Sequence, residues 1–256
     1  MSIQFSTALQ DIFKTEKKWM TILGLSVCML IPIVGPMVAF GYLFRRFARE
    51  REGHPAEDFD FNFFGDYLQA GLWPVLATLA FSLLIVPFAL LFGIAPAFLI
   101  PLAEDGNDSL MLTIMIAGFS IYMVVILLFI LASYPIILRS GLMMDFKSGF
   151  SWSFMKSFFS RVGLSLLGYF LLLSVISFPL MLLGYLALFV GVYVVAAWLQ
   201  AAMIHLLFQH YDLMLERGGE RIEVNPELTK PLGTPPIPSG VQSPQSAPPD
   251  QDSSRT

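Results

Sequence analysis

The fold is decided by residues 162–211, which read VGLSLLGYFLLLSVISFPLMLLGYLALFVGVYVVAAWLQAAMIHLLFQHY and contain no Asp, Glu, Lys or Arg. A helix needs about 20 apolar residues to cross the hydrocarbon core of a bilayer, which is about 30 Å thick. These 50 residues are therefore long enough for two crossings. Because proline and glycine interrupt helices, Phe178-Pro179 and Gly184-Tyr185 predict a turn near the middle of the stretch.

Three further stretches also lack Asp, Glu, Lys and Arg and are long enough to cross: Trp19 to Phe44, Tyr67 to Ala103 and Ser109 to Leu138. Barrel strands are short and alternate in polarity, whereas these runs are unbroken and rich in Leu, Phe, Ile and Ala. The sequence therefore predicts an all-α fold, a polytopic transmembrane helix bundle. Its hydrophobic segments lie at about 19–44, 67–101, 109–138, 162–182 and 184–208, within a helical membrane domain that covers residues 19–211.

The overall composition agrees with this interpretation. Hydrophobic residues make up 56% of the chain and charged residues only 13%, against about 25% charged in an ordinary soluble domain. This excludes a water-soluble monomer. With a formal net charge of -4 the chain has no nucleic-acid footprint, and the single cysteine, Cys28, excludes an intramolecular disulfide.

The charged connectors predict the orientation. Residues 104–108 are acidic and carry no Lys or Arg, whereas Arg139, Lys147, Lys156 and Arg161 lie between the third and fourth segments. By the positive-inside rule the first connector faces out and the second faces the cytoplasm. We therefore expect a multi-pass protein of the cell (inner) membrane with a cytoplasmic C-terminal tail over residues 212–256.

The first segment allows two interpretations, because lysines precede it and four arginines follow it. In the first, Pro32, Gly35 and Pro36 bend the chain into a re-entrant hairpin, with both ends in the cytoplasm. In the second, residues 19–44 form one tilted, kinked helix, which would be a fifth crossing. The sequence thus predicts four full crossings plus one segment of undecided form.

Both ends of the chain are expected to lie outside the bilayer core. In residues 1–18, apolar side chains at helical spacing oppose polar ones, which predicts an interfacial amphipathic helix. Residues 226–256 hold eight of the 17 prolines and few apolar side chains, so we expect disorder from about residue 226.

Sites of chemistry are not indicated. His205 and His210 are five residues apart, which turns them to different sides of a helix and argues against a shared metal. The acidic stretch from Glu57 to Asp66 lacks the glycine turn and terminal Glu of a calcium loop. We predict no catalytic residue, no metal ligand, no cofactor and no enzymatic activity.

The first 72 residues resemble an uncharacterised family of prokaryotic multi-pass membrane proteins, catalogued as domain of unknown function 4013. The resemblance lies in residues 13–19, in 31–36 with 41–43, in the arginines that precede Gly53, and in the stretch 64–71. It implies a helical membrane domain and brings no established activity. The motif positions that we expect to matter for the structure are Trp19, Pro32, Gly35, Pro36, Gly41, Tyr42, Phe64, Asp66 and Gly71.

Two classes of function follow from these patterns. Small residues such as Gly184 and Gly191 allow helices to pack closely, which favours a membrane scaffold or accessory subunit. Its partners would be the lipid bilayer and a second copy or another membrane protein. The alternative is a channel or carrier for a small solute, built on broken helices at Pro32-Pro36 and Pro87-Pro101.

Overall fold

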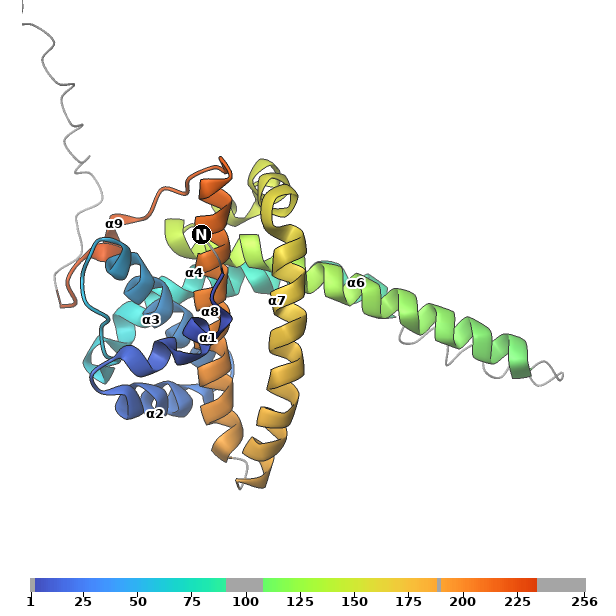
Figure 1. Ribbon diagram of the computed structural model, residues 1–256, viewed down its shortest axis with the longest axis horizontal. Helices are drawn as coiled ribbons and strands as arrows, with labels where there is room; N and C mark the ends of the chain where they lie inside the picture. Colours follow the sequence, from blue (N-terminus) through green and yellow to red (C-terminus); the bar gives the residue numbers. More distant parts are fainter. Residues whose placement is uncertain (1–2, 91–107, 188–189, 234–256) are drawn as a thin grey trace, which may run out of the picture.

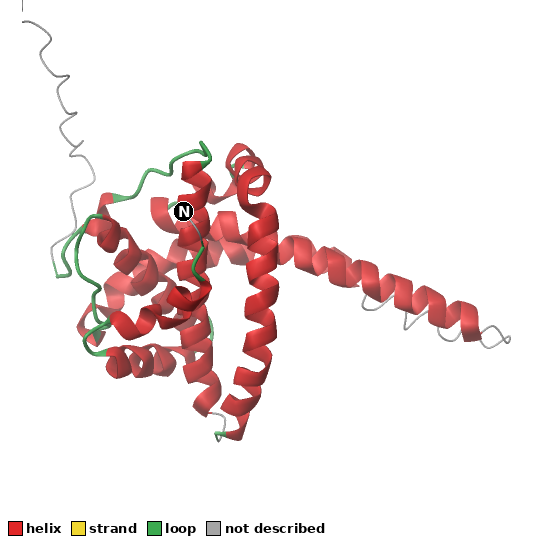
Figure 2. Cartoon of the chain, viewed as in Figure 1, coloured by secondary structure: helices red, strands yellow, loops and turns green. Residues whose placement is uncertain are grey.

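A computed structural model of the chain describes residues 3–90, 108–187 and 190–233. Within these ranges the regular elements are helices, joined by short loops (Figure 2), which confirms the predicted all-α class. In chain order they are α1 (Phe5–Gln10), η1 (Asp11–Lys14), α2 (Lys18–Met29), α3 (Val34–Arg51), η2 (Phe61–Phe63), α4 (Phe64–Ser82), η3 (Leu83–Ile85), α6 (Asp108–Met143), η5 (Lys147–Phe150), α7 (Trp152–Leu186), α8 (Val190–Glu216) and α9 (Pro226–Thr229).

Among the described residues, four helical stretches are long and apolar enough to cross a membrane, as the sequence predicts. They are Phe61–Leu90, Met115–Met143, Trp152–Leu186 and Val190–Glu216. Helix α4 packs against α6, and α7 packs against α8. In Figure 1 the α7–α8 pair runs down from the body of the molecule, whereas α6 projects to the right. The two long pairs thus extend in different directions from one shared core.

That core lies where α3 meets α4 and α8. Its fully buried side chains come from every region of the chain, including Ile12, Leu25, Leu43, Phe154 and Leu228. The apolar side chains that remain exposed lie along α2, α4, α6 and α7. The buried residues therefore form a folded head, from which the apolar helices extend.

The first hydrophobic segment is broken in two, so the hypothesis of one continuous helix over 19–44 is wrong. Helix α2 ends at Met29, and α3 begins at Val34 and packs against α2. Between them the Val34 N–H donates to the Pro32 carbonyl at 2.8 Å, across Ile33 with a φ of 70°. This is a γ-turn of the rare, strained kind, at a residue whose branched side chain disfavours positive φ. The segment therefore forms two packed helices joined by a turn, as the hairpin interpretation requires, and its re-entry into a bilayer stays a prediction.

The turn between the last two long helices lies later than predicted. Helix α7 continues through Pro179 to Leu186, so the predicted break at 179–184 is wrong. A long apolar helix tolerates one proline, because only one backbone hydrogen bond is lost. The small residues do meet as expected: a Cβ on Gly191 would lie 2.8 Å from the Gly184 carbonyl oxygen.

The N-terminal segment is bound to the long helices by hydrogen bonds. The Trp198 indole N–H donates to the Leu9 carbonyl at 2.7 Å, and the Gln4 N–H donates to the Gln209 side chain at 2.7 Å. Helix α1 packs along α8, although only Phe5–Gln10 is α-helical within the predicted 1–18 helix. The interfacial position of this segment stays a prediction.

The C-terminal segment is ordered further than predicted. Residues 226–229 form α9, and Leu228 is fully buried. The Asn225 N–H donates to the Leu142 carbonyl at 2.8 Å, which ties this segment to the end of α6. Disorder starting at about residue 226 is therefore wrong for 226–233, because apolar side chains anchor the chain there. Residues 234–256 lie outside the described part, as does most of the predicted break at Pro87-Pro101.

Candidate functional site

The motif glycines form the crossing between α3 and α4. A Cβ on Gly41 would lie 1.8 Å from the Tyr67 carbonyl oxygen, and one on Gly71 would lie 1.7 Å from the Met37 carbonyl oxygen. Neither position has room for a side chain, because the two helix backbones touch there. Such close approach is the usual role of glycine in packed membrane helices. These two motif residues therefore hold the head together.

Tyr42 lies beside this crossing, in a buried aromatic cluster. Its ring meets Phe59 and Tyr67 edge-on, each at 5.6 Å between centroids, and its hydroxyl donates to the Glu57 carbonyl at 2.7 Å. Burial raises the pKa of Tyr42, so the hydroxyl remains a donor. The connector between α3 and α4 is thus held inside the head through Phe59, whereas Phe61 stays 53% exposed.

Gly35 and the prolines serve the α2–α3 turn. A Cβ on Gly35 would lie 2.4 Å from the Cys28 carbonyl oxygen, so only glycine fits against the end of α2. Pro32 lies in the turn itself, and Pro36 occupies the first turn of α3, where a missing N–H leaves no helical bond unmade.

The remaining motif positions lie apart from these contacts. Trp19 is 64% exposed and touches Phe13 edge-on at 6.1 Å. Phe64 is half-buried at the start of α4, and Asp66 is exposed in its first turn. The structure therefore brings Gly41, Tyr42 and Gly71 together and leaves Trp19 and Asp66 outside that group.

The polar centre of the head is formed by four arginines of α3, Arg45, Arg46, Arg49 and Arg51, here called the arginine hub. Each residue of a helix advances by about 100°, so Arg45 and Arg49 share one face of α3, while Arg46 and Arg51 point in two other directions. Each arginine binds a different part of the chain: Arg45 donates to the carbonyls of Glu227 and Lys230, Arg46 pairs with Asp11 and Glu50, Arg49 pairs with Glu57, and Arg51 pairs with Asp212.

Asp11 and Arg46 form the most deeply buried ion pair of the hub. Both side chains are about 1% exposed or less, and Arg46 Nη2 lies 3.0 Å from Asp11 Oδ2. His205 Nδ1 lies 3.1 Å from Asp11 Oδ1, and Lys14 Nζ lies 3.3 Å from it. Burial alone would raise the pKa of Asp11, but the His205 hydrogen bond and the charges of Arg46 and Lys14 outweigh it and lower the pKa.

The two histidines of α8 have separate roles. His205 contacts Asp11, whereas His210 is fully buried and lies 2.7 Å from the Leu206 carbonyl oxygen through Nδ1. Within the described residues, no group of three or more His, Cys, Asp or Glu is placed to hold a metal ion. The contacts of the hub join distant segments of the chain to one another, so their role is to hold the head together.

Sequence analysis missed this hub as a site. The arginines served there only to orient the chain, and Asp11 was not singled out. At helical spacing Asp11 falls on the polar side of the N-terminal segment, so no local pattern marks it as a buried carboxylate. Nothing local in the sequence indicates that its partner is Arg46.

Comparison with known proteins adds a family. The family model described as Protein of unknown function (DUF4013) matches residues 24–201, which include α3, α4, α6, α7 and the first part of α8. No curated protein and no solved structure matches the chain.

Proposed function

The chain belongs to this family of unknown function, and from that premise we propose that it is a membrane-embedded scaffold or accessory subunit without catalytic activity of its own. Its four long apolar helices indicate a membrane location. The proposed partner is a second copy or another membrane protein, which would pack against these helices.

The observation that carries this proposal is the outer face of α6. Ser109, Thr113, Ala117 and Ser120 lie at helical spacing and are all exposed. The Thr113 and Ser120 hydroxyls donate to carbonyls of their own helix at 2.8 Å each, so they offer little polarity outward. Small side chains on an apolar helix let a second helix approach closely, and in a bilayer such packing drives association.

The arginine hub supports the same proposal. It joins the N-terminal segment, the α3–α4 connector, α8 and the C-terminal segment in one head. A scaffold needs a rigid base on which its membrane helices are held, and ion pairs to three segments together with hydrogen bonds to the fourth supply it. We place this head on the cytoplasmic side of the cell (inner) membrane by the positive-inside rule, with the C-terminus on that side.

Photo-crosslinking tests the proposal in intact membranes. The photoreactive residue p-benzoylphenylalanine is introduced at Ala117, and as a matched control at Leu112, which is also exposed on α6 but lies outside the small-residue face. We expect a discrete crosslinked protein species from position 117 and none from position 112. Equal crosslinking from both positions, or none from either, contradicts the proposal.

The channel or carrier alternative depends on the two helix breaks. The first break is present between α2 and α3, where Leu30, Ile31 and Ile33 are exposed. A carrier function requires solute flux in proteoliposomes that Gly35→Leu abolishes. The scaffold proposal instead expects Gly35→Leu to reduce the yield of folded protein, because the added side chain collides with the end of α2.

A further inference from the structure

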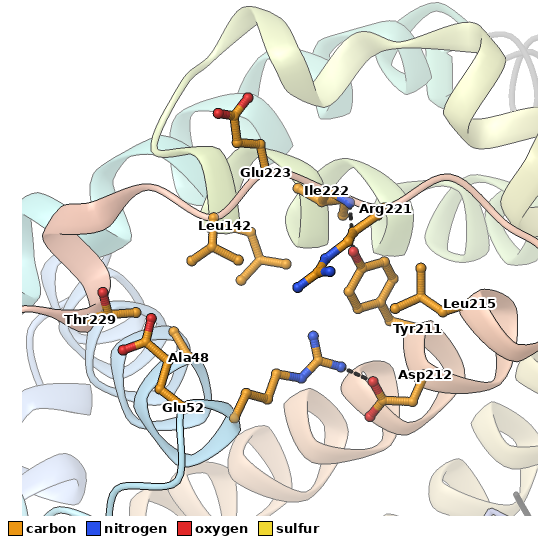
Figure 3. Close-up of a pocket in the computed structure, with 12 residues that line it drawn as sticks. Ala48, Glu52, Leu142, Tyr211, Asp212, Leu215, Arg221, Ile222, Glu223 and Thr229 are labelled. Atoms are coloured by element: carbon orange, nitrogen blue, oxygen red, sulfur yellow. Dashed lines mark hydrogen bonds and ion pairs between the residues drawn. The ribbon is translucent and has the colours of Figure 1, made fainter. Parts of the chain in front are cut away.

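A cavity of about 830 Å³ opens beside the arginine hub, at the end of the head that lies away from the α7–α8 turn (Figures 1 and 3). Its walls come from the ends of α3, α6 and α8 and from the segment after α8. This volume is within the range of sites for small organic ligands. The residues around it are Ala48, Arg51, Glu52, Leu142, Tyr211, Asp212, Leu215, Arg221, Ile222, Glu223, Val224 and Thr229.

Two guanidinium groups converge in this cavity. Figure 3 shows Arg221 pointing inward, toward the guanidinium that is paired with Asp212, which is that of Arg51. The Arg51 pair uses only part of that guanidinium, which has five N–H donors. Within the described residues the Arg221 side chain makes no hydrogen bond or ion pair. Two like charges therefore face each other: Arg51 is paired with Asp212, and the exposed Arg221 has no carboxylate partner among the described residues.

The electrostatics of Arg51 reflect this crowding. Burial lowers the pKa of Arg51, and the charge of Arg221 acts in the same direction, while Asp212 opposes both. Glu223 turns its carboxylate away from the guanidinium groups, and Glu52 lies at the edge of the cavity (Figure 3). An anion placed between Arg51 and Arg221 would relieve their repulsion and accept from both.

Tyr211 completes the polar side of the cavity. Its hydroxyl accepts from the Ile222 N–H at 2.6 Å and keeps its own proton to donate. Its ring lies under the Arg51 guanidinium, 4.9 Å from the centroid, which holds that side chain in place. The apolar lining includes Leu142, which lies across the cavity from Tyr211, and Leu215 and Ile222, which lie beside Tyr211 and Arg221 (Figure 3).

We propose that this cavity binds an organic phosphate, with the phosphate held between Arg51 and Arg221 and an apolar or aromatic part against Leu142. Guanidinium groups match a phosphate with two parallel hydrogen bonds, which gives arginine its preference for this group. The phosphate belongs either to a soluble compound or to a lipid headgroup, since both present the same chemistry.

Calorimetric titration of the full chain in detergent with phenyl phosphate tests the proposal. Arg221→Gln removes the guanidinium without breaking a contact within the described residues, and Lys156→Gln makes the same charge change at an exposed position on α7. We expect Arg221→Gln to weaken binding at least about tenfold, because the variant loses charge-assisted hydrogen bonds, which are among the stronger ones in proteins. We expect Lys156→Gln to bind as the native chain does.

A second arm distinguishes the two sources of phosphate. Nanodiscs containing phosphatidic acid are compared with nanodiscs of phosphatidylcholine alone, with phenyl phosphate as the competing ligand. If phenyl phosphate binds more weakly in the nanodiscs that contain phosphatidic acid, the site takes a lipid headgroup. If phenyl phosphate binds equally in both kinds of nanodisc, the site takes a soluble compound. No binding of phenyl phosphate or phosphatidic acid by the native chain overturns the proposal, as does equal loss of binding in Arg221→Gln and Lys156→Gln.

Discussion

Helix α3 buries charged side chains, whereas helix α6 exposes apolar ones. Helix α3 holds Arg46 at 1% exposure inside the head, whereas Phe119 on α6 is 63% exposed. In a protein surrounded only by water, this distribution would be unfavourable in both helices. In a bilayer it is favourable, because lipid solvates Phe119 and protein partners must solvate Arg46. The contrast teaches that paired charges and close packing stabilise the head of this protein, whereas contact with lipid would stabilise its projecting helices.

The largest expected effect comes from breaking the buried pair on α3. Asp11→Ala leaves the Arg46 charge buried with only Glu50 beside it, which we expect to cost about 3–5 kcal/mol of stability. Unfolding of purified protein in detergent, followed by circular dichroism, measures this loss. Lys14→Met is the matched control, because Lys14 is 52% exposed and its pair contributes about 1 kcal/mol or less. Similar losses in both variants contradict the assignment.

A smaller loss is expected from the α3–α4 crossing. Gly41→Ala places a methyl group against the Tyr67 carbonyl, and forcing the backbones apart costs about 1–3 kcal/mol. Gly65→Ala on α4 has nothing within 4 Å of the added carbon and is expected to be neutral or slightly stabilising. Thermal unfolding of the two variants side by side tests whether contact, and not helix propensity, sets the role of Gly41.

Acidification should weaken the head gradually. The folded-state pKa of Asp11 is lowered, so its stabilisation is present above its unfolded pKa of about 3.9 and is lost as the pH falls through the folded value. The expected slope from this single group is at most about 1.4 kcal/mol per pH unit, below about pH 4. Comparison of the native chain with Asp11→Asn between pH 6 and pH 3 isolates it, and parallel curves would argue against it.

The smallest effect is expected on the exposed face of α6. Phe119→Leu keeps an apolar side chain in contact with lipid, so we expect a change of no more than about 0.5 kcal/mol. Unfolding in lipid nanodiscs measures it. A loss comparable to that of Gly41→Ala would mean that Phe119 packs against protein, which would remove the contrast between α3 and α6.

Much of the fold follows from local patterns, and the errors have a common physical cause. The charge-free runs predict four long helices, because hydrophobic length is a local property. The turn after α7 was misplaced because Pro179 is tolerated inside a long apolar helix, and local sequence does not tell a tolerated proline from a helix end. The prediction that disorder begins at about residue 226 is wrong because Leu228 is buried by residues far away in the chain.

The candidate site shows the same division. Gly41 and Gly71 stand out in the sequence as motif residues, but only the fold places each against the backbone of the other helix. The arginine hub was visible as a charge cluster with the acidic connector of Glu57 beside it, but two of its partners were not visible, since Asp11 and Asp212 lie 35 and 161 positions from the arginines that they bind. Ion pairs at such separations leave no periodic signal.

By itself the sequence determines that this chain is helical and indicates a membrane location, because composition and run length decide which solvent each segment prefers. The tertiary structure alone decides that α2 and α3 form a hairpin, that Asp11 meets Arg46, and that Arg51 and Arg221 share a cavity. These contacts join residues distant in the chain, and their energies depend on distance and burial, which no local pattern encodes.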